Sequence, residues 1–474
     1  MQSHRKNPVV VVLGATGTGK SKLAVDLAAE FNGEVISADS MQVYKGLDIL
    51  TNKVTEEEMK DVPHHMISVV DHRTKFDVTN FRNMALPIVE NLHKENKIPV
   101  IVGGTNYYIE SLIWKILIDK TEDHSASESG KRLKLDEGIE TISKSNEILA
   151  ILLENSGNLE PNILLPWSNS EIHSALELVD PARAKKFHPN DRRKIIRSLQ
   201  VFYQTGRTHS DLLIEQSKHS PADGGGTGGT DEPPRKAHLG GPLRFENVIC
   251  LWIQVPNDIL ETRIYKRVDE MRERGLRQEL EEHMDFLGPD SNIVFTEGLL
   301  QSIGFKEFED YLHLQPDERK SEKGDKLFLE GAQRLQLVTR QYARKQLKWI
   351  RQRFLRSSRR QVPPVYWVDG SQKDPTSWEN NVTSVAVQIL KAYLSNDSTN
   401  PILKEKLVPE PEKPFEDDLL ARSCPVCDNR ILLGTEQWEM HLGSYKHKKM
   451  AAKKRKLAQQ TEETNVHRKA DIVN

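Results

Sequence analysis

The sequence is poor in cysteine, has no long apolar run and carries almost no net charge. Its three cysteines, Cys250, Cys424 and Cys427, are too few for a disulfide framework in a chain of 474 residues. A small disulfide-stabilised secreted protein is therefore excluded. The longest apolar runs, at 9–14 and 248–255, fall far short of the roughly 20 residues that cross a bilayer. We expect no membrane-spanning segment.

A net charge of only −2 does not exclude a polyanionic partner, because the cations are unevenly distributed. They are concentrated at 340–360 and 446–456. At the N-terminus, the polar residues 1–8 lead almost at once into an apolar run and contain no clear secretory signal or transit peptide. These features predict a protein of the cytoplasm or the nucleus.

Short apolar runs rich in β-branched residues alternate with helical patterns. The runs occupy 9–13, 35–36, 66–70, 98–102 and 248–255. This alternation is typical of an α/β fold in which helices cover both faces of a parallel sheet. The interval between 102 and 248 is too long for one crossover and contains amphipathic patterns at 170–206, so we expect an inserted helical domain there.

Changes in composition indicate the domain boundaries. Glycine and proline dominate one internal stretch, and a second stretch is polar and punctuated by proline. The predicted order is a first core segment at 1–118, a helical insertion at 119–219, a flexible Gly/Pro loop at 220–242, a second core segment with basic C-terminal helices at 243–360, a linker at 361–420, a small C-terminal module at 421–450 and a basic, disordered tail at 451–474.

The strongest local motif follows the first predicted strand. It matches the phosphate-loop pattern G-x-x-x-x-G-K-[ST] and consists of Gly14, Ala15, Thr16, Gly17, Thr18, Gly19, Lys20 and Ser21. Because it stands between a strand and a helix, we expect its backbone to surround a diphosphate or triphosphate, with Lys20 as a point charge and Ser21 as a magnesium ligand. The alternative is a glycine-rich turn without a ligand.

Two further polar groups follow predicted strands, Asp39 after 35–36 and Thr105 after 98–102. Ligands of such sheets bind outside the carboxyl ends of the strands, so both residues are candidates for the same site. Asp39 has no basic neighbour in sequence, as a general base would require, although an aspartate that caps a helix or turn would look the same. Thr105 follows Gly103 and Gly104, which a plain tight turn would also explain.

The C-terminal module contains Cys424, Cys427, His441 and His447 in the pattern C-x2-C-x13-H-x5-H. Four ligands of these types at zinc-finger spacing predict a structural zinc ion, with Leu432 and Leu442 as core candidates. The lysine-rich residues 453–456 that follow could contact RNA, act as a nuclear address or form a solvated tail.

The stretch 339–360 contains nine cations, no acid and the aromatic residues Tyr342, Trp349 and Phe354. Such a helix suits a phosphate backbone with bases stacked nearby. Basic amphipathic helices also bind membrane surfaces or calmodulin, so that alternative stays open. A second basic segment, at 188–200, is equally consistent with a solvated helix face.

Several longer motifs resemble those of the tRNA dimethylallyltransferases. They are Asp-Ser-Met-Gln-Val-Tyr-Lys-Gly-Leu-Asp-Ile at 39–49, Pro-His-His-Met at 63–66, Val-Gly-Gly-Thr-Asn-Tyr-Tyr at 102–108, His-Pro-Asn-Asp-Arg-Arg at 188–193 and Gln-Ser-Ile-Gly-Phe-Lys-Glu at 301–307. The resemblance covers roughly 8–360 in collinear order and is far more specific than the phosphate loop. It implies a P-loop-type core that binds dimethylallyl diphosphate and transfers its prenyl group to N6 of adenosine 37 in tRNA. The products would be N6-isopentenyladenosine and diphosphate.

The resemblance also implies roles for individual residues. Asp39 would be the general base, and Thr105 and Arg263 would bind the diphosphate leaving group. The predicted tRNA-contacting residues are Asp39, Ser40, Met41, Gln42, Arg192, Arg193, Arg197 and Gln200, together with Arg340, Arg344, Lys345 and Lys348, which the charge of the stretch 339–360 predicts. The C-terminal module resembles the matrin-type finger of eukaryotic members, which often also modify mitochondrial tRNA, so a mitochondrial fraction is expected by resemblance alone.

Two other classes share some of these features. A nucleotide kinase would have the same phosphate loop, but no strand ends in a convincing second magnesium-binding aspartate. A non-catalytic RNA-binding protein would explain the finger and the basic helices, but would need neither the phosphate loop nor Asp39. The sequence therefore favours a monomeric, magnesium-dependent transferase whose partners are tRNA and dimethylallyl diphosphate.

Overall fold

The computed structural model describes 5–72, 74–115, 146–154, 164, 166–218, 242–287, 302–356, 361–372, 374–411, 421–427, 430–433 and 435–455. The described residues form two compact units. The first contains 5–115 and 242–411, and the second contains 146–218 and 421–455. The predicted loop at 220–242, except its last residue, and the tail beyond 455 lie outside the described residues.

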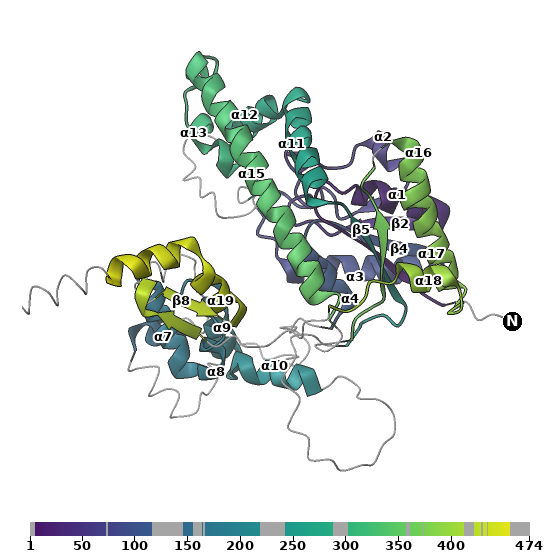
Figure 1. Ribbon diagram of the computed structural model, residues 1–474. Coiled ribbons are helices and arrows are strands. Elements are labelled where there is room, and N and C mark those ends of the chain that lie inside the picture. Colours follow the sequence, from purple (N-terminus) through teal and green to yellow (C-terminus); the bar gives the residue numbers. More distant parts are fainter. Residues whose placement is uncertain are drawn as a thin grey trace, which may run out of the picture. The chain divides into compact units, whose positions relative to one another are not determined.

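The first unit is built on a six-stranded sheet with the order β3-β2-β4-β1-β5-β6. Figure 1 labels the strands β2, β4 and β5 of this sheet. Every strand pair in it is parallel. The strands are β1 (Val9–Leu13), β2 (Gly33–Ser37), β3 (His64–His65), β4 (Ile98–Val102), β5 (Val248–Gln254) and β6 (Val365–Asp369). The predicted α/β fold with a parallel core is confirmed.

Helices cover both faces of this sheet, which explains why its central strands are continuously apolar. In β1, Val9, Val11 and Leu13 belong to one core, and the intervening Val10 and Val12 belong to the other. The first core is completed by α3 (Val78–Lys94), α4 (Asn106–Ile113), α11 (Asn257–Glu273) and α15 (Glu322–Arg353). The second core is completed by α1 (Lys20–Glu30) and α17 (Ser384–Leu394).

The remaining elements of the first unit are short, apart from α12. They are α2 (Glu56–Met59), α12 (Leu276–Leu287), η2 (Lys306–Phe308), α13 (Glu309–Leu312), α14 (Pro316–Arg319), α16 (Pro375–Trp378), η4 (Glu379–Thr383) and α18 (Pro401–Lys406). The longest helix, α15, has 32 residues and therefore spans roughly 48 Å. No described helix of the protein combines the length and apolar character that a membrane crossing requires.

Two predictions about this unit are wrong. The strand expected at 66–70 does not form, because Met66 and Ser68 have φ angles of 64° and 52°, which a strand cannot contain. The pairing with β2 is made instead by His64–His65. The linker expected at 361–420 also contains β6, which continues the sheet beside β5, and α17, which packs on its face.

The second unit joins the helical insertion to the C-terminal module. The insertion contains α6 (Glu147–Glu154), α7 (Asn169–Val179), α8 (Pro181–Ala184), α9 (Arg192–Thr205) and α10 (His209–Lys218). It has an apolar core of its own, which includes Leu152, Leu176 and Leu199. The inserted helical domain is thus present as predicted.

The module itself consists of an antiparallel hairpin and helices. The hairpin pairs β7 (Ala421–Cys424) with β8 (Arg430–Leu433), with η5 (Pro425–Cys427) between them. After it follow α19 (Thr435–Gly443) and a helical stretch at 445–455. Leu432 is buried as predicted, but Leu442 is 39% exposed and is not a core residue.

One motif of the insertion contacts this module. The backbone N–H of Asn190 donates to Nδ1 of His188 at 3.0 Å, which leaves the ring proton on Nε2. Nε2 in turn donates to the carbonyl oxygen of Ile431 in β8, also at 3.0 Å. His188 is therefore a structural bridge within the second unit.

Candidate active site and metal centre

The loop after β1 has the conformation that a phosphate loop requires. Gly17 and Gly19 have φ angles of 85° and 95°, which residues with a Cβ rarely adopt. A Cβ on Gly19 would also collide with the ring of Trp378 in α16. The helix α1 begins directly after Gly19, so its first N–H groups are directed to the space that the loop surrounds.

Lys20 is buried in this loop with only 8% of its surface exposed. Its Nζ donates to the carbonyl oxygen of Ala15 at 2.8 Å. Burial, together with the nearby charge of Arg267, lowers the pKa of Lys20 to about 7, while Asp39 acts in the opposite direction. A buried cation in this position is stabilised when an anion binds beside it.

Asp39 and Thr105 lie together, as their places at strand ends predict. The strands β2 and β4 are neighbours and parallel, so their carboxyl ends meet at one edge of the sheet. One oxygen of Asp39, Oδ2, accepts from the backbone N–H of Gly104 at 3.2 Å. The hydroxyl of Thr105 accepts from the N–H of Ser40 at 3.0 Å and donates to its Oγ at 3.1 Å.

The second carboxylate oxygen of Asp39 binds within the loop 39–42. Oδ1 accepts from the N–H of Met41 at 3.0 Å. The carboxylate also acts electrostatically on Lys20 and Arg267, which joins it to the phosphate loop. Asp39 therefore lies between a cationic phosphate site and the loop 39–42.

Gln42 has both ends of its amide occupied. Its Oε1 accepts from the hydroxyl of Ser37 at 3.0 Å, and its Nε2 donates to the carbonyl oxygens of Thr51 and Asn52 at 3.2 and 3.1 Å. In this state the side chain stabilises the loop 42–52. A direct contact with a base would have to replace one of these bonds.

The guanidinium of Arg263 binds the loop after β6. It donates to the carbonyl oxygens of Gly370 and Ser371, both at 2.7 Å. The residue that sequence reasoning missed is Arg267, one turn further along α11. Burial lowers the pKa of Arg267 to about 10 against the opposing charges of Asp39 and Glu270. The buried Nε of Arg267 has no hydrogen-bond partner among the described residues.

The four cations of α15 that the sequence predicts to bind tRNA differ in their surroundings. Arg344, Lys345 and Lys348 are exposed, whereas Arg340 pairs with Glu261 in α11. Of the three aromatic residues of this stretch, Phe354 is fully buried in the first core and cannot stack on a base.

The basic segment of the insertion, at 188–200, also contains both exposed residues and residues with structural contacts. Arg193 and Arg197 are exposed and Gln200 is half-buried. Arg192 is different, because its guanidinium donates to the carbonyl oxygen of Trp167 at 2.8 Å, to Oδ1 of Asn169 at 3.2 Å and to the carbonyl oxygen of Leu164. The prediction grouped Arg192 with the RNA-facing cations, but its observed contacts are structural.

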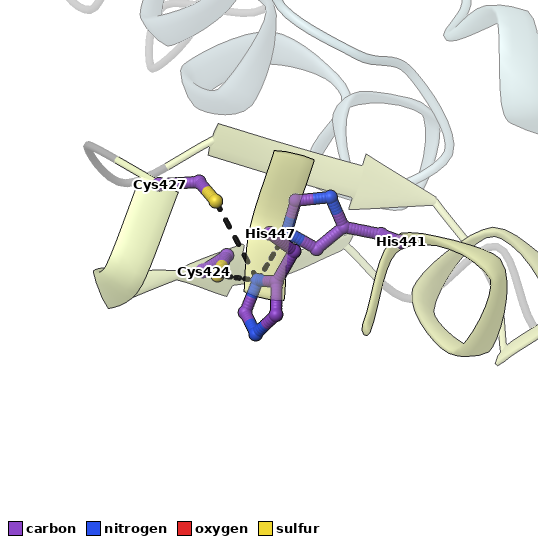
Figure 2. Close-up of side chains that lie close together, drawn as sticks. All are labelled: Cys424, Cys427, His441 and His447. Atoms are coloured by element: carbon purple, nitrogen blue, oxygen red, sulfur yellow. Dashed lines mark hydrogen bonds between the residues drawn. The ribbon is translucent and has the colours of Figure 1, made fainter. Parts of the chain in front are cut away.

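The C-terminal module brings Cys424, Cys427, His441 and His447 together (Figure 2). One ligand atom from each residue lies within 4.8 Å of the other three. Nδ1 of His447 lies 3.6 and 3.5 Å from the two sulfur atoms and 3.1 Å from Nε2 of His441. The predicted ligand set is therefore assembled around one point, as a single metal ion requires.

Comparisons with known proteins agree with this site. Residues 42–353 match the family model described as IPP transferase. A tRNA dimethylallyltransferase of Mus musculus is 39% identical, over 96% of this chain and 88% of that protein. One of Saccharomyces cerevisiae is 30% identical, over 93% of this chain and 91% of that protein. A solved structure of a eukaryotic dimethylallyltransferase acting on tRNA is similar with a TM-score of 0.69 and 28% identity, over 97% of this chain and 100% of that chain.

Proposed function

Since this chain belongs to the IPP transferase family and is a tRNA-modifying prenyltransferase, we propose that it moves the dimethylallyl group of dimethylallyl diphosphate to N6 of adenosine 37 in tRNA. The observation that carries the proposal is the meeting of a cationic phosphate loop with Asp39 and Thr105 at one sheet edge. A phosphate loop explains the diphosphate, and a carboxylate beside it explains the proton acceptor.

In the proposed reaction, N6 of the adenine attacks C1 of the dimethylallyl group. The C1–O bond breaks as the N6–C1 bond forms, and its electron pair leaves with the diphosphate. The N6 proton passes to Asp39, because an exocyclic amine whose lone pair is delocalised into the ring is a poor nucleophile without proton removal. The adenine must leave the anticodon-loop stack to reach this edge of the sheet.

The leaving diphosphate gains negative charge, and this chain supplies several donors for it. Lys20 and the N–H groups at the start of α1 are within the loop, and Arg267 adds a second, half-buried cation. We propose that the hydroxyl of Thr105 also donates to the diphosphate after it gives up its bond to Oγ of Ser40. Arg263 can contribute after it exchanges its two carbonyl partners for the anion.

We propose magnesium as the metal of the reaction. The hydroxyl of Ser21 is exposed at the first turn of α1 and is the type of oxygen ligand that magnesium accepts beside phosphate oxygens. When bound there, magnesium would supply charge neutralisation of the diphosphate.

The test is incubation of the protein with dimethylallyl diphosphate, magnesium and an unmodified tRNA with an A-A-A run in its anticodon loop, followed by nucleoside mass analysis. Prenylated adenosine is the expected product. ATP hydrolysis without that product would favour a nucleotide kinase instead.

We further propose that the monomer is active, since one chain supplies all these groups. Light scattering of the active protein checks this.

We propose that the exposed cations of α15 bind the tRNA backbone. Neutralising Arg344, Lys345 or Lys348 to glutamine is expected to weaken tRNA binding and to lower the slope of log affinity against log salt by about 1 for each phosphate that is no longer neutralised. Filter binding at a series of salt concentrations measures this slope. The matched control is Lys326→Gln, an exposed cation near the other end of α15. Equal slopes in all four variants would contradict the assignment.

We propose zinc as the metal of the C-terminal module. A tetrahedron with zinc–sulfur bonds of ~2.3 Å and zinc–nitrogen bonds of ~2.0 Å has edges of roughly 3.3–3.8 Å. The observed contacts of 3.1–3.6 Å between the ligand atoms are close to these edges. The buried sulfur atoms of Cys424 and Cys427 also suit zinc better than magnesium.

Replacing Cys427 by serine is expected to release the zinc and to weaken tRNA binding more than it lowers kcat. The reason is that the module carries basic residues but contributes none of the groups of the active site. Bound zinc is measured by atomic absorption, and tRNA affinity by filter binding, with Glu439→Gln on α19 as the control. Unchanged affinity and salt dependence would assign the module to localisation or to another partner.

A further inference from the structure

The helix α15 presents two polar side chains to the active site, Tyr342 and Gln346, which are one turn apart. Gln346 is only 3% exposed, and Tyr342 is half-buried. Both donate to the same acceptor, the carbonyl oxygen of Gly104, at 2.7 Å from the Tyr342 hydroxyl and 2.8 Å from Nε2 of Gln346. The N–H of Gly104 is the group that binds Asp39.

The other end of the Gln346 amide binds the phosphate loop. The backbone N–H of Thr16 donates to Oε1 of Gln346 at 2.8 Å. A single buried amide therefore connects the loop after β1 to the turn after β4. Asn106 donates to the backbone carbonyl of Gln346 at 3.4 Å, which adds a further contact between α15 and that turn.

We propose that Gln346 is a positioning residue that fixes the position of the phosphate loop relative to the carboxylate of Asp39. The inference rests on the proposed function, because it assigns Thr16 to the diphosphate site and Asp39 to proton transfer. Both ends of the Gln346 amide are occupied by backbone groups of the protein. It acts through the Thr16 N–H on one side and, on the other, through the carbonyl group of Gly104, the residue whose N–H binds Asp39.

The chemistry of the two contacts requires a primary amide. The Thr16 N–H needs an acceptor, and the Gly104 carbonyl needs a donor. Glutamate provides only the acceptor, and methionine provides neither while filling a similar volume. The crowding at Gly104 supports this interpretation, because a Cβ there would lie 2.6 Å from Oδ2 of Asp39, 3.2 Å from Nε2 of Gln346 and 3.4 Å from the Tyr342 hydroxyl.

The same turn of α15 has a second face. Arg344, Lys345 and Lys348 are exposed while Gln346 is buried between them in sequence. The helix thus holds the proposed tRNA-binding cations and the amide on one rigid element. Docking of tRNA on the outer face can therefore fix the position of both loops on the inner face.

The first test is Gln346→Met in the full-length protein. We expect a loss of kcat of roughly 10²-fold, because displacements near 1 Å at a reacting centre have effects of this size. Affinity for inorganic diphosphate with magnesium, measured by calorimetry, should also fall, since the Thr16 N–H loses its fixed orientation. The affinity for tRNA should stay within about twofold, because Gln346 is not on the surface.

A second variant separates the two contacts. Gln346→Glu keeps the acceptor for Thr16 but places a carboxylate beside Asp39, which disfavours the ionised form of its neighbour. We expect diphosphate affinity to be largely retained, kcat to fall, and the acid limb of the pH profile of kcat to move to higher pH. A role confined to the stability of the fold would instead lower diphosphate affinity to the same extent in Gln346→Glu and Gln346→Met, since it would not depend on the acceptor for the Thr16 N–H.

The matched control is Ile350→Val, a mild change on the same buried face of α15. It should lower thermal stability to an extent comparable with the Gln346 variants and leave kcat, diphosphate affinity and the pH profile unchanged. Wild-type diphosphate affinity and kcat in Gln346→Met would overturn the proposal. If the wild-type protein binds diphosphate but forms no prenylated adenosine, the proposed function fails, while the diphosphate comparison still decides the part played by Gln346.

Discussion

Replacing Asp39 by asparagine is expected to lower kcat by roughly 10²- to 10⁴-fold, the usual contribution of a general base. Asparagine has nearly the same shape and keeps one oxygen for a backbone donor, but it cannot accept the N6 proton. The two donors are the N–H groups of Met41 and Gly104, at 3.0 and 3.2 Å. Single-turnover formation of prenylated adenosine measures the effect, and filter binding measures tRNA affinity.

The expected pattern is a large loss of turnover with little change in tRNA affinity. Asp39→Ala is a second variant, since it leaves room for water to bind both backbone donors. The matched control is Glu90→Gln, which removes one exposed carboxylate on α3. Parallel losses of turnover and affinity in the Asp39 variants would show that the residue binds tRNA instead of accepting the proton.

Replacing Lys20 by methionine is expected to lower kcat/KM for dimethylallyl diphosphate by roughly 10²- to 10³-fold, the cost of one preorganised donor to a developing anion. Lys20 is buried in the loop with its Nζ bound to the carbonyl oxygen of Ala15 at 2.8 Å. Its charge is therefore held where the diphosphate is expected. Steady-state kinetics with varied diphosphate donor measures the loss, and calorimetry with inorganic diphosphate measures binding alone.

The same variant should unfold at a higher temperature than the wild-type protein without ligand. Burial lowers the pKa of Lys20 to about 7 from 10.5, so this side chain opposes folding below pH 10.5, and the cost grows as the pH falls until it levels off below about pH 7. Methionine removes that cost, and opposite shifts in stability and activity are typical of a functional group. Lys326→Met is the exposed control. Undiminished diphosphate affinity in Lys20→Met would remove Lys20 from the site.

Much of the core could be predicted from the sequence because its strands are buried on both faces. The runs at 9–13 and 98–102 are apolar throughout, and the run at 248–255 is apolar except for Gln254. Each run coincides closely with a strand. The strand β6 was missed because five residues after two prolines resemble a linker. Val365–Asp369 becomes part of the sheet only because it pairs in parallel with the backbone of β5.

Part of the candidate site could likewise be predicted from the sequence, and part could not. Asp39 and Thr105 could be placed together because each directly follows a strand, and parallel strands end at one edge. Arg267 could have been noticed as the cation one turn beyond Arg263 on α11. Its burial near Lys20 and Asp39 has no local signature, since any amphipathic helix carries exposed arginines at this spacing.

The sequence by itself determined the phosphate loop, the base candidate Asp39 and the four metal ligands of the C-terminal module, because each depends on spacing within a short segment. Only the tertiary structure decided which polar side chains serve those groups. Gln346 and Gly104 are 242 positions apart, and Thr16 and Gln346 are 330 apart. Contacts at such separations leave no periodic pattern in the chain, and they form only when the sheet and α15 pack together.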